Sequence, residues 1–377
     1  MPLLSRTLVL VFLAALGSGT SFNLLLTVVP LYASLSSGEI GAGLATGALM
    51  LSTVAAELIT PRLVARFGER VVFAAGLALL GAPALALPAS AELAAILAVC
   101  LVRGLGFGVT VVVGSAMVAT LVPPERRGEG LGLYGVVVGV PSLLALPLGL
   151  WLVGQVGYAP VFVGGGLAAL ASLAATLGLP GREPAVEEHV GVVAGLRTPA
   201  LIRPAIVFSA TTIAAGIVVT FLALSRPWAS AGLVAMALLV QVVMATIARW
   251  WAGRHGDRHG AARLLLPAVA TAALGMFALA LAATPAALLG SMALFGAGFG
   301  VTQNASLALM FDRVSRPGYS AVSAVWNLAY DAGMGGGAVF FGLLVARTGY
   351  TAGFLFIGVL MIAALAPAWR DLATLQR

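Results

Sequence analysis

The segment Leu93–Val122 decides the class of this protein. It reads LAAILAVCLVRGLGFGVTVVVGSAMVATLV and holds a single charged residue, Arg103. About 20 apolar residues are enough for a helix to cross the hydrocarbon core of a bilayer. At a rise of about 1.5 Å per residue, a helix over this segment would be about 45 Å long. The segment therefore predicts a transmembrane helix.

The rest of the chain has the same character. Of its 377 residues, 61% are hydrophobic and only 9% are charged, and the mean hydropathy is +1.08. Soluble domains carry about 25% charged residues. The composition thus argues against a soluble enzyme, a disordered protein and a nucleic-acid-binding domain, despite the formal net charge of +7. At about 31 residues for each span and its loop, the length allows about twelve crossings and no large soluble domain.

Breaks at charge and proline clusters divide the chain into twelve apolar runs, and we predict an all-α integral membrane protein with twelve transmembrane helices. The first run stays apolar or small for about 27 residues, longer than the 7 to 15 of a signal-peptide core, so we expect it to be a span. The predicted helices cover residues 7–33, 40–64, 71–88, 93–122, 131–153, 160–179, 204–224, 229–251, 261–283, 286–311, 320–346 and 349–369.

Arginine positions predict the orientation. All twenty basic residues are arginine, and with an internal N-terminus seventeen of them fall on the cytoplasmic side. Arg226 and Arg347 fall at external ends, and Arg103 lies within a span. Because cytoplasmic loops carry the excess of basic residues, we expect a multi-pass protein of the inner (plasma) membrane with both termini in the cytoplasm.

Short repeats indicate two related halves. Gly106-Phe-Gly-Val-Thr110 recurs as Gly298-Phe-Gly-Val-Thr302, and Gly157-Tyr158 recurs as Gly349-Tyr350, both 192 residues later. Arg66-Phe-Gly68-Glu-Arg70 is matched by Arg254-His-Gly256-Asp-Arg258, 188 residues later. Repeats of this kind mark a duplicated architecture. We predict two pseudo-symmetric six-helix bundles at residues 1–180 and 204–377, joined by a cytoplasmic linker at 181–203.

Two parallel six-helix halves with an inner linker resemble the major facilitator superfamily of secondary transporters. The loop at 61–70 is similar to the family's signature between helices 2 and 3, with matches at Arg66, Gly68 and Arg70 but Ala65 in place of the acid. In the second copy Gly253 replaces the acid. The resemblance implies that these loops brace the inner face when the cavity opens outward; simple positive-inside charge is the alternative. The predicted gate-loop residues are Arg62, Arg66, Gly68, Arg70, Arg254, Gly256 and Arg258.

Polar side chains inside the spans indicate a central cavity, because such groups are costly in hydrocarbon and tend to face water or substrate. They recur at helical spacing in several spans. The alternative is that they hydrogen-bond neighbouring helices together. The predicted cavity residues are Asn23, Thr27, Gln241, Gln303, Asn304, Asn327 and Tyr330.

Three charged residues lie inside spans, at a cost of roughly 2.5 to 3.5 kcal/mol each even on the lenient insertion scale. Arg103 and Asp331 are expected near the midplane, and Glu57 near the cytoplasmic mouth. Burial raises the pKa of a carboxyl group, so Asp331, and next Glu57, are predicted proton or cation sites with Arg103 as countercharge. The alternative is a structural ion pair and an interfacial Glu57 paired with Arg62 or Arg66.

Glycine patterns suggest close helix packing. Gly104–Gly108 and Gly296–Gly300 are Gly-x-x-x-Gly motifs, which let helices approach closely. The three successive glycines at 335–337 weaken a helix, so this run is a predicted bend, with static packing as the alternative.

No catalytic constellation is present. The sole cysteine is Cys100, and the histidines His189, His255 and His259 are all expected in loops, too few to make a metal site with three or four ligands. We expect no enzyme activity, cofactor or metal, with a proton gradient as the energy source. The predicted function is proton-coupled efflux of hydrophobic or weakly charged small molecules by a monomer in the lipid bilayer, with no nucleic-acid partner. The alternatives are a proton symporter for uptake of a metabolite and a non-transporting membrane sensor or scaffold.

Overall fold

The computed structural model describes residues 5–122, 127–179, 199–314 and 319–373, which contain helices and no strand. The chain divides into two compact units, Met1–Val186 and Glu187–Arg377, here called the N-terminal and C-terminal units. The division falls within the predicted linker, most of which lies outside the described residues. Helix α9 already begins at Pro199, so the predicted linker end at residue 203 is wrong by about one helical turn.

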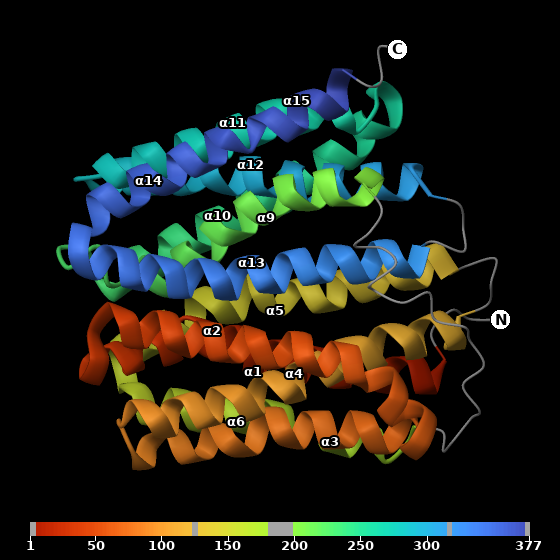
Figure 1. Ribbon diagram of the computed structural model, residues 1–377. Coiled ribbons are helices and arrows are strands. Elements are labelled where there is room, and N and C mark those ends of the chain that lie inside the picture. The colour runs from red at the N-terminus through yellow and green to blue at the C-terminus, as the bar shows by residue number, and fades with distance from the viewer. Residues whose placement is uncertain (1–4, 123–126, 180–198, 315–318, 374–377) are drawn as a thin grey trace. The chain divides into compact units, whose positions relative to one another are not determined.

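The N-terminal unit contains seven α-helices and one 3-10 helix in its described residues (Figure 1). These elements are α1 (Arg6–Leu26), α2 (Val28–Phe67), α3 (Glu69–Gly81), η1 (Ala82–Ala89), α4 (Leu93–Leu121), α5 (Arg127–Val156), α6 (Tyr158–Ala171) and α7 (Leu173–Thr176).

The C-terminal unit repeats the plan. In Figure 1, α11 and α14 of this unit lie side by side, as α3 and α6 do in the first unit. The elements are α9 (Pro199–Phe221), α10 (Ala231–His259), α11 (Ala262–Leu281), α12 (Pro285–Asp312), α13 (Tyr319–Thr348), α14 (Tyr350–Ala363) and α15 (Leu365–Ala373).

Eleven stretches of the described residues are helical, long and apolar enough to cross a membrane, so the predicted count of twelve is not confirmed. The first stretch, Arg6–Phe67, has 62 residues, whereas a crossing needs about 20. It contains non-helical backbone at Ser37 and at Gly38, whose φ is 55°. Each side of this break is long enough for a crossing of its own.

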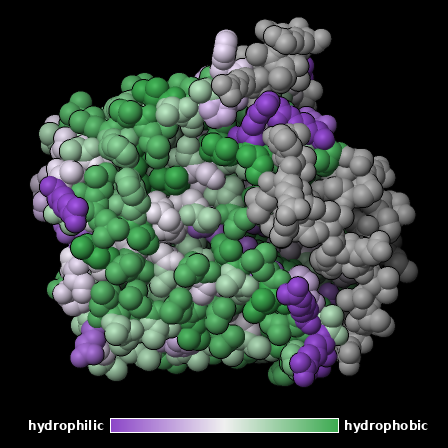
Figure 2. Space-filling view, viewed as in Figure 1, coloured by the Kyte–Doolittle hydropathy of each residue, from purple (hydrophilic) through white to green (hydrophobic). Residues whose placement is uncertain are grey.

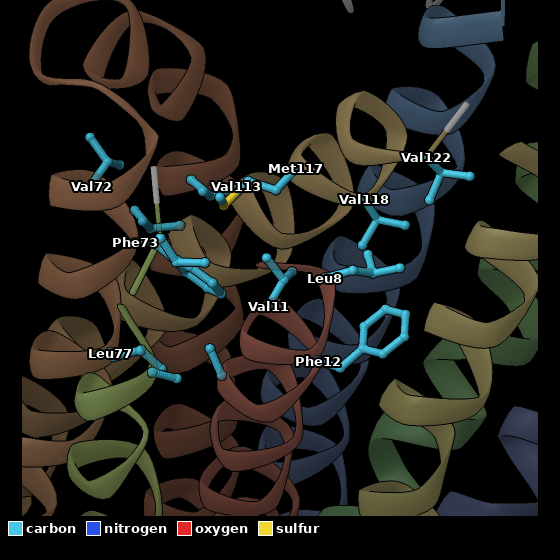
Figure 3. Packing of buried hydrophobic residues seen from close by; sticks show 14 of the residues in the cluster. Leu8, Val11, Phe12, Val72, Phe73, Leu77, Val113, Met117, Val118 and Val122 are labelled. Atoms are coloured by element: carbon cyan, nitrogen blue, oxygen red, sulfur yellow. The ribbon is translucent and has the colours of Figure 1, made fainter. Parts of the chain in front are cut away.

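Apolar side chains pack the interior of each unit and also cover its outside, as expected for helices that lie in lipid. Near one end of the N-terminal unit, Leu8 and Val11 of α1 pack against Phe73 of α3 and Val113 of α4 (Figure 3). Figure 2 shows hydrophobic residues over most of the visible face, with hydrophilic residues in small patches.

Glycine contacts show that the two units share one register, with an offset of 192 residues. The two Gly-x-x-x-Gly motifs pack against the second and third long helices of their own units. A Cβ atom at any of these glycines would lie closer than 3.0 Å to backbone atoms of the neighbouring helix. The matched contacts are Gly104 with Leu49 and Gly296 with Gln241, Gly106 with Leu80 and Gly298 with Ala272, and Gly108 with Thr53 and Gly300 with Ala245.

Helix corners follow the same offset. Gly68 links α2 to α3 with φ 82° and ψ 156°, and Gly260 links α10 to α11 with φ 88° and ψ 129°. Gly157 and Gly349 form the corresponding corners before α6 and α14. A side chain is strongly disfavoured in this part of φ/ψ space, so glycine permits these abrupt turns.

The predicted bend at residues 335–337 is absent. Helix α13 runs without interruption from Tyr319 to Thr348. A Cβ at Gly337 would lie within 3.0 Å of the backbone of Ile213 on α9. The glycines therefore serve close packing of α13 on α9.

Candidate functional site

Asp331 is the most deeply buried acidic side chain described in the C-terminal unit, with 7% of its surface exposed. It lies on α13, inside the apolar stretch Val322–Thr348. Tyr330 precedes it and interacts electrostatically with both Asp331 and Arg249 of α10. The structure thus brings a carboxylate, a phenol and a guanidinium together in one unit. Sequence reasoning missed Arg249, because its place near the predicted end of a span suggested only a cytoplasmic charge.

Aromatic rings border this charged group. Phe208 of α9 stacks on Trp326 of α13, with 4.6 Å between ring centroids and an interplanar angle of 13°. Tyr330 lies one helical turn after Trp326, with 6.1 Å between their ring centroids. The Trp326 side chain also donates from Nε1 to Ser306 Oγ of α12 at 3.2 Å. The i, i+4 spacing of Trp326 and Tyr330 was visible in the sequence, but their contact with α9 and α12 required the fold.

Amide side chains of α12 line the same region of the unit. Gln303 is one turn before Ser306, is 9% exposed, and its Oε1 atom has no hydrogen-bond partner among the described residues. A Cβ at Gly253 of α10 would lie 3.6 Å from the Asn304 Nδ2 atom, so the Asn304 side chain faces α10. Asn327 is half-buried, and Gln241 is buried where α12 packs on α10.

Some polar side chains of the spans join helices together. Thr212 of α9 donates from Oγ1 to the Ala329 carbonyl of α13 at 3.0 Å. In the N-terminal unit, Thr53 of α2 donates to the Gly104 carbonyl of α4 at 3.2 Å. These hydroxyls have the packing role that the sequence left open as an alternative.

The two predicted cavity residues of the N-terminal unit differ in environment. Asn23 donates from Nδ2 to the Gly19 carbonyl of its own helix at 2.8 Å. Thr27 separates α1 from α2, is 4% exposed, and its Oγ1 atom has no partner among the described residues.

Arg103 is 2% exposed and donates to two backbone carbonyls of its own unit. Its Nε atom donates to Leu80 O and its Nη2 atom to Ser21 O, both at 3.1 Å. Leu80 lies where α3 gives way to η1. In a 3-10 turn its carbonyl would bond the N–H of residue 83, but Pro83 has none. Arg103 supplies that missing donor and connects α4 with α1 and α3.

Glu57 lies on α2, is half-buried, and stands ten residues before the end of the helix at Phe67. In the 192-residue register its counterpart is Arg249 of α10. The two units therefore carry opposite charges at equivalent positions.

The predicted gate loops are helix corners. Pro61, Arg62 and Arg66 lie in α2, Gly68 alone forms the corner, and Arg70 already belongs to α3. In the second copy Arg254, Gly256 and Arg258 lie inside α10, so their predicted placement in a loop is wrong, as it is for His255 and His259.

The second corner is at Gly260, four residues beyond the predicted position. The Arg-x-Gly-x-Arg spelling recurs at 254–258, but the backbone needs its positive φ at the residue where the helix ends. The structural counterparts of Arg62 and Arg66 are accordingly Arg254 and Arg258.

Comparison with a family model decides the relationship. The model described as Major Facilitator Superfamily matches residues 11–334. The chain belongs to the major facilitator superfamily. The family consists of transporters, and this superfamily member is not an enzyme.

One relative in sequence is the "Uncharacterized MFS-type transporter YfiU" of Bacillus subtilis (strain 168). It is 30% identical over 148 residues, a match that covers 39% of this chain and 28% of that protein.

Solved structures of superfamily transporters have the same fold. The peptide transporter POT, in complex with sulfate, has a TM-score of 0.80 and 17% identity, covering 100% of this chain and 96% of that chain. The nucleoside transporter NupG has a TM-score of 0.74 and 16% identity, covering 97% and 98%. The xylose transporter XylE from E. coli has a TM-score of 0.76 and 13% identity, covering 97% of each chain.

Proposed function

We propose that this superfamily member is a proton-coupled secondary transporter that exports hydrophobic or weakly charged small molecules by alternating access. The observation that carries the proposal is Asp331, a carboxylate with 7% exposure inside a membrane-spanning stretch. An ionisable group at such depth is costly and is usually functional. A buried carboxyl group can take up a proton from one compartment and release it to the other as its surroundings change.

Neighbouring charges refine the roles. Arg103 donates to carbonyls within the N-terminal unit, whereas Arg249 and Asp331 both interact with Tyr330. We therefore assign the countercharge of Asp331 to Arg249, in place of Arg103. Glu57 is the second coupling carboxylate in the proposal.

The residues near Asp331 also support the proposed cargo. Stacked rings of Phe208, Trp326 and Tyr330 offer apolar, flat surface, and few fixed charges accompany them. Such surroundings suit hydrophobic molecules better than sugars, which need many paired hydrogen bonds.

Reconstituted flux tests the mechanism. Proteoliposomes with an imposed pH gradient would be given ethidium, a permanently charged dye that does not itself distribute with pH. An exchanger of protons for dye accumulates ethidium when the interior is acidic, and a symporter does so when the exterior is acidic. A scaffold moves no dye under either gradient, which would contradict the proposal.

The Asp331→Asn variant tests the coupling site. We expect its gradient-driven uptake to fall to the level of protein-free liposomes while dye exchange without a gradient persists, because only the proton step needs the carboxylate. Asp312→Asn is the matched control: this carboxylate is exposed at the end of α12 and its loss should leave both fluxes intact. Unchanged gradient-driven uptake by Asp331→Asn would remove Asp331 from the mechanism.

Orientation and span count complete the proposal. We place both termini in the cytoplasm of a cell with the chain in its inner (plasma) membrane, and count twelve crossings by dividing Arg6–Phe67 at Ser37 and Gly38. Accessibility labelling of single cysteines at Gly38 and Gly260, in a Cys100→Ser background, checks this: the proposal expects label at Gly38 from outside only and at Gly260 from inside only.

A further inference from the structure

The end of α10 near Gly260 presents two neighbouring ridges of exposed side chains. One ridge consists of Trp250, Arg254 and Arg258, spaced four residues apart, and the other of Trp251, His255 and His259. Trp250 is 62% exposed and Trp251 46% exposed. Residues spaced by four lie on one face of a helix, so each ridge leads from an indole ring to cationic or polar groups at the helix end. These six residues are called the α10 ridges below.

Ring contacts order these side chains. The Arg254 guanidinium carbon lies 4.0 Å from the centroid of the Trp250 ring. His255 stacks on Trp251 at 4.8 Å and His259 stacks on His255 at 4.2 Å between ring centroids. A guanidinium that is stacked by its face still presents N–H groups along its edge, the geometry with which arginine binds phosphate groups.

The ridges have the dimensions of a membrane interface. Indole rings favour the boundary between hydrocarbon and headgroups. Arg254 lies four residues beyond Trp250, about 6 Å along the helix axis. The headgroup layer of one leaflet is about 5 to 8 Å thick. With Trp250 at that boundary, Arg254 reaches the depth of the lipid phosphates.

The N-terminal unit lacks these features at the equivalent positions. Leu58 and Ile59 stand where the C-terminal unit has Trp250 and Trp251, and Leu63 and Phe67 stand for the two histidines. Residues 249–263 hold four arginines and one aspartate, whereas residues 57–71 hold three arginines and two glutamates. The aromatic rings and the larger basic excess are therefore specific to α10 and its corner with α11.

From this asymmetry we propose that the α10 ridges bind the headgroup of an anionic phospholipid. Arg254 and Arg258 pair with the lipid phosphate, and the two indoles pack on the glycerol and upper acyl chain. The site is separate from the Asp331 region and depends on the proposed orientation only for the choice of leaflet.

Native mass spectrometry of the purified, delipidated protein tests this assignment. Phosphatidylglycerol and phosphatidylcholine with identical acyl chains would be titrated separately. We expect phosphatidylglycerol to bind more tightly, and Arg254→Gln with Arg258→Gln to weaken it about 25-fold. That is about fivefold for each arginine, corresponding to about 1 kcal/mol.

The register supplies the control. Arg62→Gln with Arg66→Gln removes the equivalent arginines of the first unit and should weaken phosphatidylglycerol binding less than about fivefold. Trp250→Leu with Trp251→Ile installs the first unit's residues at exposed positions, which keeps the fold, and should weaken binding about fivefold through the lost cation–π contact and interfacial anchor. Equal losses in the two arginine pairs, equal binding of both lipids, or full binding by the tryptophan variant would each overturn the proposal.

Discussion

Two buried arginines perform similar work at the residue scale. Arg103 bonds the Leu80 carbonyl at the end of α3, and Arg226 bonds the Leu279 carbonyl near the end of α11 while its guanidinium lies over the Phe354 ring. The final carbonyls of a helix lack intrahelical donors. Burial lowers the pKa of Arg226, since water is removed from its charge. Each unit thus uses an arginine to satisfy the end of its third long helix.

The partnership of Arg103 with Pro83 predicts a coupled effect on stability. Arg103→Met leaves Leu80 O without a donor, at about 1 to 3 kcal/mol, although removal of a buried charge acts in the opposite direction. Pro83→Ala restores an N–H that can reach Leu80 O. We therefore expect Arg103→Met to be less harmful in the Pro83→Ala background by at least about 1 kcal/mol, or about 3 °C in apparent melting temperature.

Thermal unfolding of the four proteins in detergent measures this coupling. Arg347→Gln, an exposed arginine in the last turn of α13, is the control and should show no dependence on Pro83. An identical shift for Arg103→Met in both backgrounds would contradict the role assigned to Arg103.

At the scale of elements, glycines set how closely helices pack. A Cβ at Gly106 would meet backbone atoms of Gly76 and Leu80 on α3, and one at Gly298 would meet Ala268 and Ala272 on α11. Backbone atoms cannot move aside as a flexible side chain can. Gly106→Ala and Gly298→Ala should therefore each destabilise by about 1 to 3 kcal/mol, the usual cost of overpacking.

Gly290 gives the matched control, because it lies on α12 like Gly298 but has nothing within 4 Å of its Cβ direction. Gly290→Ala should raise stability by up to about 1 kcal/mol through helix propensity alone. Melting temperatures in detergent compare the three variants. A loss for Gly290→Ala as large as that for Gly298→Ala would show that helix contacts are not the cause.

Sequence patterns predicted these elements well where the signal was compositional. Long apolar runs located the spans, and Gly106-Phe-Gly-Val-Thr110 gave the correct offset between the halves. Contacts between elements were less accessible: Trp326 with Ser306 and Tyr330 with Arg249 join helices that are far apart in sequence. The bend predicted at residues 335–337 failed because propensity ignores the packing partner on α9.

At the scale of the whole molecule, one duplication explains both the matched contacts and the error in the second corner. The repeated Arg-x-Gly-x-Arg letters gave an offset of 188 there, whereas the glycine contacts and corners follow 192. Four residues are about one helical turn, so α10 keeps the same face toward its neighbours while its corner falls one turn later. Letter similarity alone could not distinguish the two registers, since both place an arginine at position 258.

The register makes a prediction about the corner glycines. Gly68 and Gly260 have φ near 82° and 88°, where a side chain is strained, whereas Gly256 is inside α10 and its nearest Cβ neighbour would be at 3.7 Å. Gly68→Ala and Gly260→Ala should each cost about 1 to 3 kcal/mol, and Gly256→Ala should be neutral or stabilising by up to about 1 kcal/mol. Thermal unfolding of the three single variants measures the difference, with transport of ethidium as a second readout. If Gly256→Ala behaved like Gly68→Ala while Gly260→Ala had no effect, the 188-residue register would be correct at this corner, and the pairing of Arg254 and Arg258 with Arg62 and Arg66 would fail with it.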